Sequence, residues 1–427
     1  MRSKSGGVKL IFVDEISVVG SSMFTVQLNN RLKDIRGCTK DFGVSIIAIG
    51  DLFQLEPVMD AYVFKALKNL DYAVLAPSLW HQHFRMFELN EIMRQRDSKV
   101  SAELLNRLRE GKHAESDTLV LKERVVQEET TNSLDAPHLL IQNAKVDEFN
   151  VRAHNAASKN KFQINAQDSF LGANSSQLRD KILTQISKDP RKTKQLALHL
   201  CLAEGERTEL VMSLRTEDGM TNGAGNVIKL VQLRQQEKPS GIVWIQFDCS
   251  NVGQKTRNEK IHLYLQGIKH TWTPIKLVTT QFAVGKNKTP QVVRKQFPLR
   301  PAAAKTIHRS QCDSETKIVV NFSTKKTIPH IHYVGLSRVT TIESLYITDL
   351  CESKIPVHPD VKKEMERVRT RAKLKLCISP LYEITGSVLK LCYLNARSVH
   401  KHIQDLRSDV NYLRADVNIF AETKFSF

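Results

Sequence analysis

Two adjacent carboxylates follow a short apolar run near the start of the sequence. Residues 10–13 read Leu-Ile-Phe-Val and lead directly into Asp14 and Glu15. An aspartate in this position can bind Mg²⁺ together with phosphate oxygens, and a neighbouring glutamate can orient an attacking water. This is the chemistry of a Walker B motif. Because an acidic pair after a strand is common, its meaning depends on what surrounds it.

A glutamine stands just after a second run of the same kind. Residues 44–49 are mostly apolar and end in Gly50 and Asp51, and Gln54 follows. A glutamine amide can hydrogen-bond a terminal phosphate or the attacking water without adding a competing negative charge. The alternative is an ordinary surface turn, since Gly-Asp is a frequent turn dipeptide.

Two arginines are candidates for stabilising charge on a phosphoryl group during transfer. Arg94 lies in Ile-Met-Arg-Gln and Arg338 in Gly-Leu-Ser-Arg. A guanidinium is permanently charged and can bind two phosphate oxygens at once. In so basic a chain, a single arginine is more often a solvated surface group.

A polar segment, residues 306–311, offers contacts suited to a nucleic-acid backbone. It reads Thr-Ile-His-Arg-Ser-Gln, so Thr306, His308, Arg309 and Gln311 carry hydroxyl, imidazole, guanidinium and amide groups. We expect this segment to open a helix, where side chains and backbone N–H groups can bind phosphate. An ordinary capped helix is the alternative.

The elements expected to position these residues belong to an α/β fold. The two apolar runs resemble buried strands of a parallel sheet, joined by a helix over 21–36, and open sheets of this kind bind ligands at the carboxyl ends of their strands. Further elements are expected as a helix over 101–109 ended by Gly111, a strand at 139–141, a helix over 146–154, a strand at 317–322 and a helical linker over 361–375. Residues 157–200 are polar and predict a mobile insertion.

Composition points to a folded protein that binds polyanions. The 427 residues carry a net charge of +18, and such an excess favours nucleic acid because neutralising phosphates releases counterions. A basic but indifferent surface is the alternative. The seven cysteines form no C-x-x-C pair, which indicates reduced thiols and no metal cluster, and no apolar run is long enough to predict a membrane span.

Taken in order, the motifs resemble those of the petite-integration-frequency (Pif) type DNA helicases. The resemblance covers residues 8–350, and no single motif carries it. The matching segments are 12–17 (Phe-Val-Asp-Glu-Ile-Ser), 50–55 (Gly-Asp-Leu-Phe-Gln-Leu), 94–95 (Arg-Gln), 219–223 (Gly-Met-Thr-Asn-Gly), 306–311 and 333–339 (Tyr-Val-Gly-Leu-Ser-Arg-Val).

The resemblance implies two RecA-like lobes with a small SH3-like β-barrel inserted in the second. It also implies ATP-driven movement from five-prime to three-prime on single-stranded DNA, and a nuclear or mitochondrial location. The divisions expected are a partial first lobe (1–135), the start of the second lobe with a polar insertion (136–222), the barrel (223–297), the end of the second lobe (298–352), a linker (353–385) and a tail fragment (386–427).

The same resemblance assigns a role to each candidate residue. Asp14 and Glu15 would serve magnesium and water, Gln54 would sense the γ-phosphate of ATP, and Gln311 would sit at the junction between lobes. Arg94 and Arg338 would reach the phosphates from the two lobes. Thr306, His308 and Arg309 would contact the DNA strand.

One motif of the family is missing from the sequence. No G-x-x-x-x-G-K-[ST] occurs in it, so the loop that cradles the β- and γ-phosphates of ATP is not present. We therefore expect the first lobe to be incomplete, beginning at Walker B, and the chain alone to bind ATP poorly. A catalytically dead protein that binds single-stranded nucleic acid is the alternative function.

The tail resembles the opening of the apurinic-type endonuclease domain of retrotransposons. Two short apolar runs end near Asn395 and Glu422, which by that resemblance would position phosphate and hold a metal. The match covers only the last part of the chain and lacks the later catalytic residues. We expect no nuclease activity from it. The combination suggests a gene model that spans fragments of mobile elements, and a genuine fusion of the two pieces is the alternative.

Overall fold

The fold was analysed in a computed structural model of the chain. The described residues are 8–67, 78–131, 136–157, 160–172, 175–187, 189–234, 239–284, 291–311, 313–350, 355–374, 391–395 and 417–421. They divide into two compact units: the first comprises 1–82 and 90–365, and the second comprises 83–89 and 366–427. Glu422 lies outside the described residues.

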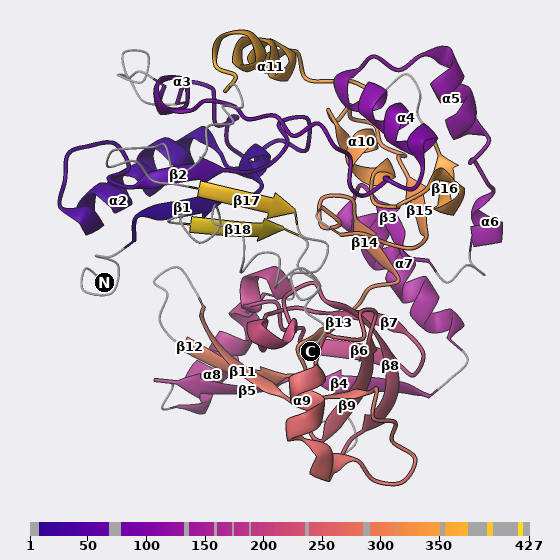
Figure 1. The fold of residues 1–427 in the computed structure, drawn as a ribbon. Helices are drawn as coiled ribbons and strands as arrows, with labels where there is room; N and C mark the ends of the chain where they lie inside the picture. Colours follow the sequence, from indigo (N-terminus) through magenta and orange to yellow (C-terminus); the bar gives the residue numbers. More distant parts are fainter. Residues whose placement is uncertain are drawn as a thin grey trace, which may run out of the picture. The chain divides into compact units, whose positions relative to one another are not determined.

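The amino-terminal part of the first unit is a strand, a helix and a second strand (Figure 1). The strands pair in parallel, with Val13 opposite Ala48, so the predicted crossover is confirmed. The elements are β1 (Leu10–Val13), η1 (Ile16–Val18), η2 (Met23–Leu28, a π-helix), α2 (Asn29–Arg36), β2 (Ser45–Ala48) and α3 (Leu79–His83).

The prediction that β1 is covered on both faces is wrong for the described residues. Phe12, in the middle of the strand, is 43% exposed. A continuous apolar run cannot distinguish a covered strand from one with a bare face, because the pattern is the same in both.

A second α/β layer lies further along the chain. Its four strands run in the order β14-β3-β15-β16 and every pair is parallel. The elements are α4 (Lys99–Glu110), α5 (Glu115–Lys122), α6 (Glu128–Thr131), β3 (His138–Leu140), α7 (Asn143–Ala156), β14 (Ala304–Thr306), β15 (Ile318–Asn321), α10 (Ile331–Leu336), η6 (Ile342–Ser344) and β16 (Leu345–Asp349).

Helices cover both faces of this sheet (Figure 1). On one face, Leu104 of α4 and Val334 of α10 share a core with Leu139 and Ile318 of the strands. On the other, Val146 of α7 packs against the sheet. The predicted division placed α4 and α5 in the first lobe, which was expected to end at residue 135. In the structure both helices bury their apolar sides against the four-stranded sheet that we call the second lobe.

Between β3 and β14 the chain builds further sheets. One is antiparallel with the strand order β10-β9-β8-β7-β13, and a smaller one has the order β11-β12-β5. The elements are β4 (Lys161–Asn165), β5 (Gln167–Leu171), α8 (Ser176–Gln185), η3 (Pro190–Thr193), β6 (His199–Ala203), β7 (Arg207–Leu210), η4 (Thr216–Asp218), β8 (Gly225–Gln232), β9 (Ile242–Phe247), α9 (Gln254–Glu259), η5 (Ile261–Leu263), β10 (Thr273–Ile275), β11 (Val278–Ala283), β12 (Gln291–Gln296) and β13 (Leu299–Pro301).

Two expectations for this region need correction. Residues 157–200 were expected to form a mobile insertion. They instead contain strands and a helix, and the side chains of Ile164, Ile182 and Leu200 are buried. The limits 223–297 are also too narrow, since β7 and β13 belong to the five-stranded sheet. These strands bury only one face, so apolar and polar residues alternate along them. The high proportion of polar residues made this alternation difficult to recognise in the sequence.

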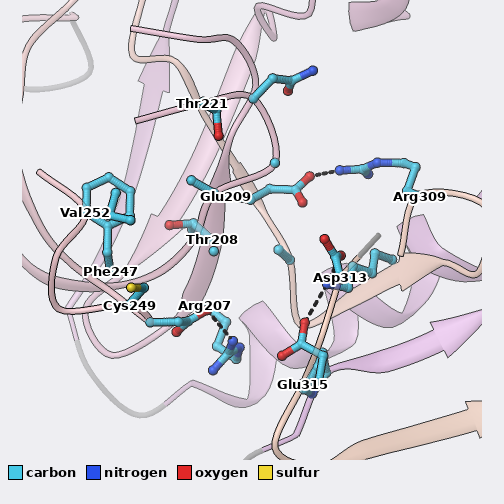
Figure 2. Close-up of a pocket in the computed structure, with 18 of the residues that line it drawn as sticks. Arg207, Thr208, Glu209, Thr221, Phe247, Cys249, Val252, Arg309, Asp313 and Glu315 are labelled. Carbon is cyan, nitrogen blue, oxygen red and sulfur yellow. Dashed lines mark hydrogen bonds and ion pairs between the residues drawn. The ribbon is translucent and has the colours of Figure 1, made fainter. Parts of the chain in front are cut away.

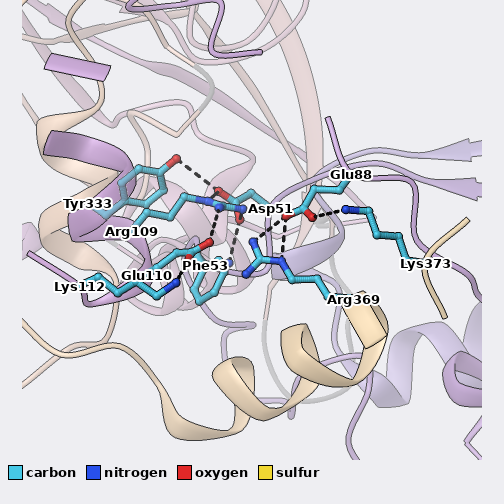
Figure 3. Close-up of polar contacts among 9 residues, drawn as sticks. All are labelled: Asp51, Phe53, Glu88, Arg109, Glu110, Lys112, Tyr333, Arg369 and Lys373. Atoms are coloured by element: carbon cyan, nitrogen blue, oxygen red, sulfur yellow. Dashed lines mark hydrogen bonds and ion pairs between the residues drawn. The ribbon is translucent and has the colours of Figure 1, made fainter. Parts of the chain in front are cut away.

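The second unit is small. The carboxyl-terminal end of α11 (Pro359–Arg371) is joined to the segment 83–89, where the Glu88 carboxylate accepts hydrogen bonds from Arg369 at 2.6 Å and Lys373 at 3.3 Å (Figure 3). The helix predicted over 361–375 is confirmed within 361–371, and it begins earlier than predicted, at Pro359. Residue 375 lies outside the described residues. Two tail strands, β17 (Leu391–Asn395) and β18 (Val417–Ala421), pair in parallel.

Candidate functional site

The acidic pair and the second motif loop meet at one edge of the β1–β2 sheet. The backbone N–H of Ile16 donates to the carbonyl of Ile49 at 2.9 Å, which holds the turn after β1 against the end of β2. Glu15 adopts a left-handed conformation with φ 51°. Gly50 has φ 145°, and a Cβ there would lie 2.8 Å from the Ile16 nitrogen. Only glycine lets the two turns approach so closely.

One amide side chain connects this edge to the second lobe. The Nε2 group of Gln311 donates to Oε2 of Glu15 at 3.0 Å and to Oε1 of Gln54 at 2.9 Å. Leu55, beside Gln54, is buried in the core of the second lobe. The structure therefore brings together three of the residues that the sequence singled out, from segments far apart in the chain.

Asp14 lies at the same edge with its side chain exposed. One carboxylate oxygen accepts the backbone N–H of Glu15 at 2.8 Å. No group of three or more His, Cys, Asp or Glu side chains able to hold a metal occurs among the residues described. A single carboxylate suits Mg²⁺, which proteins hold through one or two carboxylates with phosphates and water completing the shell.

Sequence reasoning missed the partners of Asp51. Arg109 of α4 donates two hydrogen bonds to this carboxylate, at 2.7 and 2.8 Å, and the hydroxyl of Tyr333 donates a third at 3.3 Å (Figure 3). Burial alone would lower the pKa of Arg109, but the paired carboxylate raises it. Burial, and then the nearby Asp51 charge, raise the pKa of Tyr333. The first-lobe loop is thus tied to two helices of the second.

The two candidate arginines make contacts within or onto the second lobe. Arg94 donates to Oγ of Ser314 at 2.8 Å and to the carbonyl of Ser337 at 3.1 Å. Arg338 is 2% exposed and donates to the carbonyls of Val334 at 2.8 Å and Ser310 at 3.3 Å. In this conformation Arg338 supports the turn after β14, a packing role that its sequence context did not indicate.

The polar segment 306–311 does not open a helix, contrary to prediction. Thr306 ends strand β14 and the residues after it form a turn. Thr306 is buried and its hydroxyl accepts the N–H of Arg309 at 3.3 Å. His308 and Arg309 are the exposed members of the predicted strand-binding set, and the guanidinium of Arg309 is paired with Glu209.

A cleft of about 580 Å³ opens between this turn and the five-stranded sheet (Figure 2). One wall carries Thr221 and Asn222 of the 219–223 motif, and the other carries Arg309 and Gln311. Charged pairs line it. They are Arg207 with Asp248 at 2.8 Å, Lys305 with Asp313 and Glu315 at 2.7 Å each, and Glu209 with Arg300 and Arg309.

For the tail, the structure gives only the strands. Asn395 ends β17 opposite Ala421 of β18, and the position of its side chain is not among the described features. The assignments of Asn395 and Glu422 stay predictions. Along the described ranges, no helix combines the length and the apolarity that crossing a bilayer requires.

Comparison with known proteins identifies relatives. Residues 2–118 match the family described as PIF1-like helicase. The ATP-dependent DNA helicase PIF1 of Emericella nidulans is 25% identical over 381 residues, covering 83% of this chain and 48% of that protein. The Danio rerio protein of the same name is 25% identical over 366 residues, with coverage of 84% and 49%. The chain spans about half the length of the curated relatives it matches.

Solved structures show the same fold. The crystal structure of Pif1 helicase from Candida albicans superposes with a TM-score of 0.64 at 20% identity, covering 86% of this chain and 78% of that one. The structure of Bacteroides Pif1 bound to ssDNA gives a TM-score of 0.58 at 19% identity, with coverage of 84% and 75%. The chain therefore has the RecA-like α/β fold of Pif1 helicases.

Proposed function

We propose that this chain, whose residues 2–118 match the PIF1-like helicase family, is part of an ATP-driven motor that moves five-prime to three-prime along single-stranded DNA. The observation that carries the proposal is the side chain of Gln311, which donates to both Glu15 and Gln54. The amide of Gln311, from the second lobe, thereby contacts residues that follow both strands, β1 and β2, of the first lobe. Such a contact is what a motor needs to couple nucleotide state to lobe movement.

In this proposal each residue at the junction has one task. Asp14 would hold Mg²⁺, which when bound neutralises developing charge on the phosphates. Glu15 orients the attacking water, Gln54 contacts the γ-phosphate, and Gln311 exchanges its present partners for the nucleotide. Arg94 and Arg338 would reach the phosphates only after the lobes move, because both now donate to groups of the second lobe.

DNA binding is assigned to the cleft and the turn beside it. His308 and Arg309 are exposed there, and the five-stranded sheet that forms the other wall is the region that we propose to be the SH3-like barrel. Backbone contacts of this kind carry no base code, so binding is expected to be independent of sequence. Thr306 is expected to shape the turn rather than contact the strand, because its side chain is buried.

Residues 1–427 alone are proposed to bind DNA without turning over ATP. The sequence contains no G-x-x-x-x-G-K-[ST], the loop whose N–H groups and lysine bind the β- and γ-phosphates. Binding without hydrolysis is the second candidate function, and the net charge of +18 favours it. An origin from a mobile element is part of the proposal, and it is supported by the resemblance of residues 386–427 to the opening of a retrotransposon endonuclease domain.

Two measurements on the purified chain test the proposal. Fluorescence anisotropy with labelled oligonucleotides of unrelated sequence, over a range of salt, should show similar affinities that weaken as salt rises. Hydrolysis of ATP with and without DNA should stay at background. A folded sample that binds no oligonucleotide at low salt would contradict the DNA-binding role. Turnover that disappears in Glu15→Gln would contradict the assigned inactivity, with Glu115→Gln as the control.

A further inference from the structure

Glu209 lies where the two walls of the cleft meet. It belongs to β7, and its side chain is only 5% exposed. Its carboxylate pairs with Arg300, directly opposite on the neighbouring strand β13. It also pairs with Arg309 from the turn after β14 (Figure 2). One buried carboxylate thus takes up two guanidinium groups that come from different elements.

The pairing bears directly on DNA binding. A carboxylate and a phosphate occupy the same fork of an arginine, so Arg309 cannot bind a backbone phosphate fully while it holds Glu209. Arg309 keeps a third of its side chain exposed, at 33%, and Arg300 keeps 28%. Both guanidinium groups are therefore reachable by a strand in the cleft.

The other cations of the cleft do not compensate. Arg207 is paired with Asp248, and Lys305 is paired with both Asp313 and Glu315. The lining therefore presents balanced pairs rather than a positive surface, although the whole chain carries +18. Whatever affinity the cleft has for phosphate depends on how readily its carboxylates release their partners.

We propose that Glu209 is an internal competitor of nucleic-acid phosphate, holding Arg309 and Arg300 until a single strand displaces it and so lowering the affinity of the cleft for DNA. The inference rests on the proposed function and adds its regulation. It assigns to Glu209 a role that none of the sequence motifs indicated. The partner it competes with is a sugar-phosphate backbone, since the cleft offers guanidinium forks and, apart from Phe247, no aromatic ring among its described lining residues on which a base could stack.

The test is Glu209→Gln, which keeps the shape of the side chain and removes its charge. With a labelled oligo-dT probe at low salt, this variant should bind about threefold to tenfold more tightly than the wild-type chain. Each additional ion pair with a phosphate should make the salt slope more negative by about 0.7. Glu115→Gln, an exposed position on α5, makes the same change in net charge and should leave affinity and slope unaltered.

Two further variants separate competition from loosened packing. Adding Arg309→Ala and Arg300→Ala together to Glu209→Gln should abolish the increase in affinity, because both released guanidinium groups are then absent. Glu209→Asp keeps the charge and withdraws the carboxylate by one methylene, so a smaller increase is expected at unchanged net charge. Thermal unfolding of each variant establishes that it is folded, and Glu209→Asp serves as the main test if Glu209→Gln is not.

The outcomes distinguish this inference from the proposed function. If the wild-type chain binds and both Glu209 variants match the Glu115→Gln control, or bind more weakly, the competitor role is wrong and DNA binding stands. If no folded variant binds DNA at all, the DNA-binding function itself fails. Tighter binding that survives the combined removal of Arg309 and Arg300 would also overturn the role, because the increase would not come from the released arginines.

Discussion

At the scale of single residues, Asp51 carries the contact between the two lobes. Its carboxylate accepts hydrogen bonds from Arg109 and Tyr333, while the ring of Phe53 lies 4.7 Å from the Arg109 guanidinium (Figure 3). The side chains of Asp51 and Arg109 are both less than one-fifth exposed, at 17% and 19%. Removing one partner of such a buried pair destabilises the fold, because the remaining charge is left without its counterpart.

We predict that Asp51→Asn lowers the free energy of unfolding by about 1–3 kcal/mol, since it leaves the guanidinium of Arg109 without this countercharge. The matched control is Asp97→Asn, whose carboxylate is 86% exposed and lies 3.7 Å from Arg96. That change should cost less than about 0.5 kcal/mol, because exposed pairs contribute little. Urea unfolding of both variants measures the difference. Equal losses of unfolding free energy would show that the buried Asp51–Arg109 pair stabilises the fold no more than an exposed pair does.

The roles of individual residues were only partly predictable. Glu15, Gln54 and Gln311 could be singled out because each occupies a motif, and the structure joins them by hydrogen bonds. The pairs of Asp51 with Arg109 and of Glu209 with Arg300 could not be, because the partners are 58 and 91 positions apart and no local pattern records them. Pairing between distant side chains is a property of the packed fold and leaves no periodic trace in the sequence.

At the scale of elements, the turn after β2 depends on glycine. Gly50 has φ 145° and its missing Cβ leaves room for the backbone nitrogen of Ile16. We predict that Gly50→Ala lowers the free energy of unfolding by about 2–4 kcal/mol, through backbone strain and displacement of the turn that carries Glu15. The measurement is denaturant unfolding of the purified variant.

Gly37 provides the comparison for that prediction. It also has positive φ, at 65°, but a Cβ there would meet no atom within 4 Å. Gly37→Ala should therefore lower the free energy of unfolding by only about 1 kcal/mol, the cost of holding an alanine at positive φ. If the two variants lose the same stability, the close approach of the two motif turns does not constrain the site.

Elements with strong periodicity were predictable and those with mixed composition were not. Helix α4 was expected because its leucines fall on one face and Gly111 follows it, and the structure ends the helix there with Gly111 in a left-handed conformation. The segment 306–311 was expected to be helical but forms a turn, since Ile307 and Ser310 are buried by neighbouring elements. Burial of Ile307 and Ser310 against the rest of the fold thus outweighed the local sequence pattern that favoured a helix.

At the scale of the whole molecule, buried histidines link stability to pH. His138, His330 and His332 are each almost fully buried, and burial lowers the pKa of each to about 4. Neither ring nitrogen of His332 has a hydrogen-bond partner in the part of the chain that the structure describes. The ring instead stacks on Phe322, with centroids 4.2 Å apart. A proton on this ring would find no acceptor among the described residues.

The sign of the effect follows from the direction of the shift. An unfolded histidine has a pKa near 6.5, so between about pH 6.5 and pH 4 the unfolded chain binds protons that the folded chain does not. The stability that these residues contribute is complete above about pH 6.5 and is lost as pH falls toward 4. At pH 5 each neutral histidine should have lost about 2 kcal/mol of that contribution.

We predict that His332→Leu flattens this dependence, because leucine fills the same buried place on α10 and takes up no proton. Urea unfolding at pH 7.5 and at pH 5 should show that the variant loses about 2 kcal/mol less than the wild-type chain over this interval. His262→Leu, at an exposed position, should leave the interval unchanged. An identical loss in wild type and His332→Leu would mean that His332 is protonated in the folded chain, and the stacked, buried environment would then not keep it neutral.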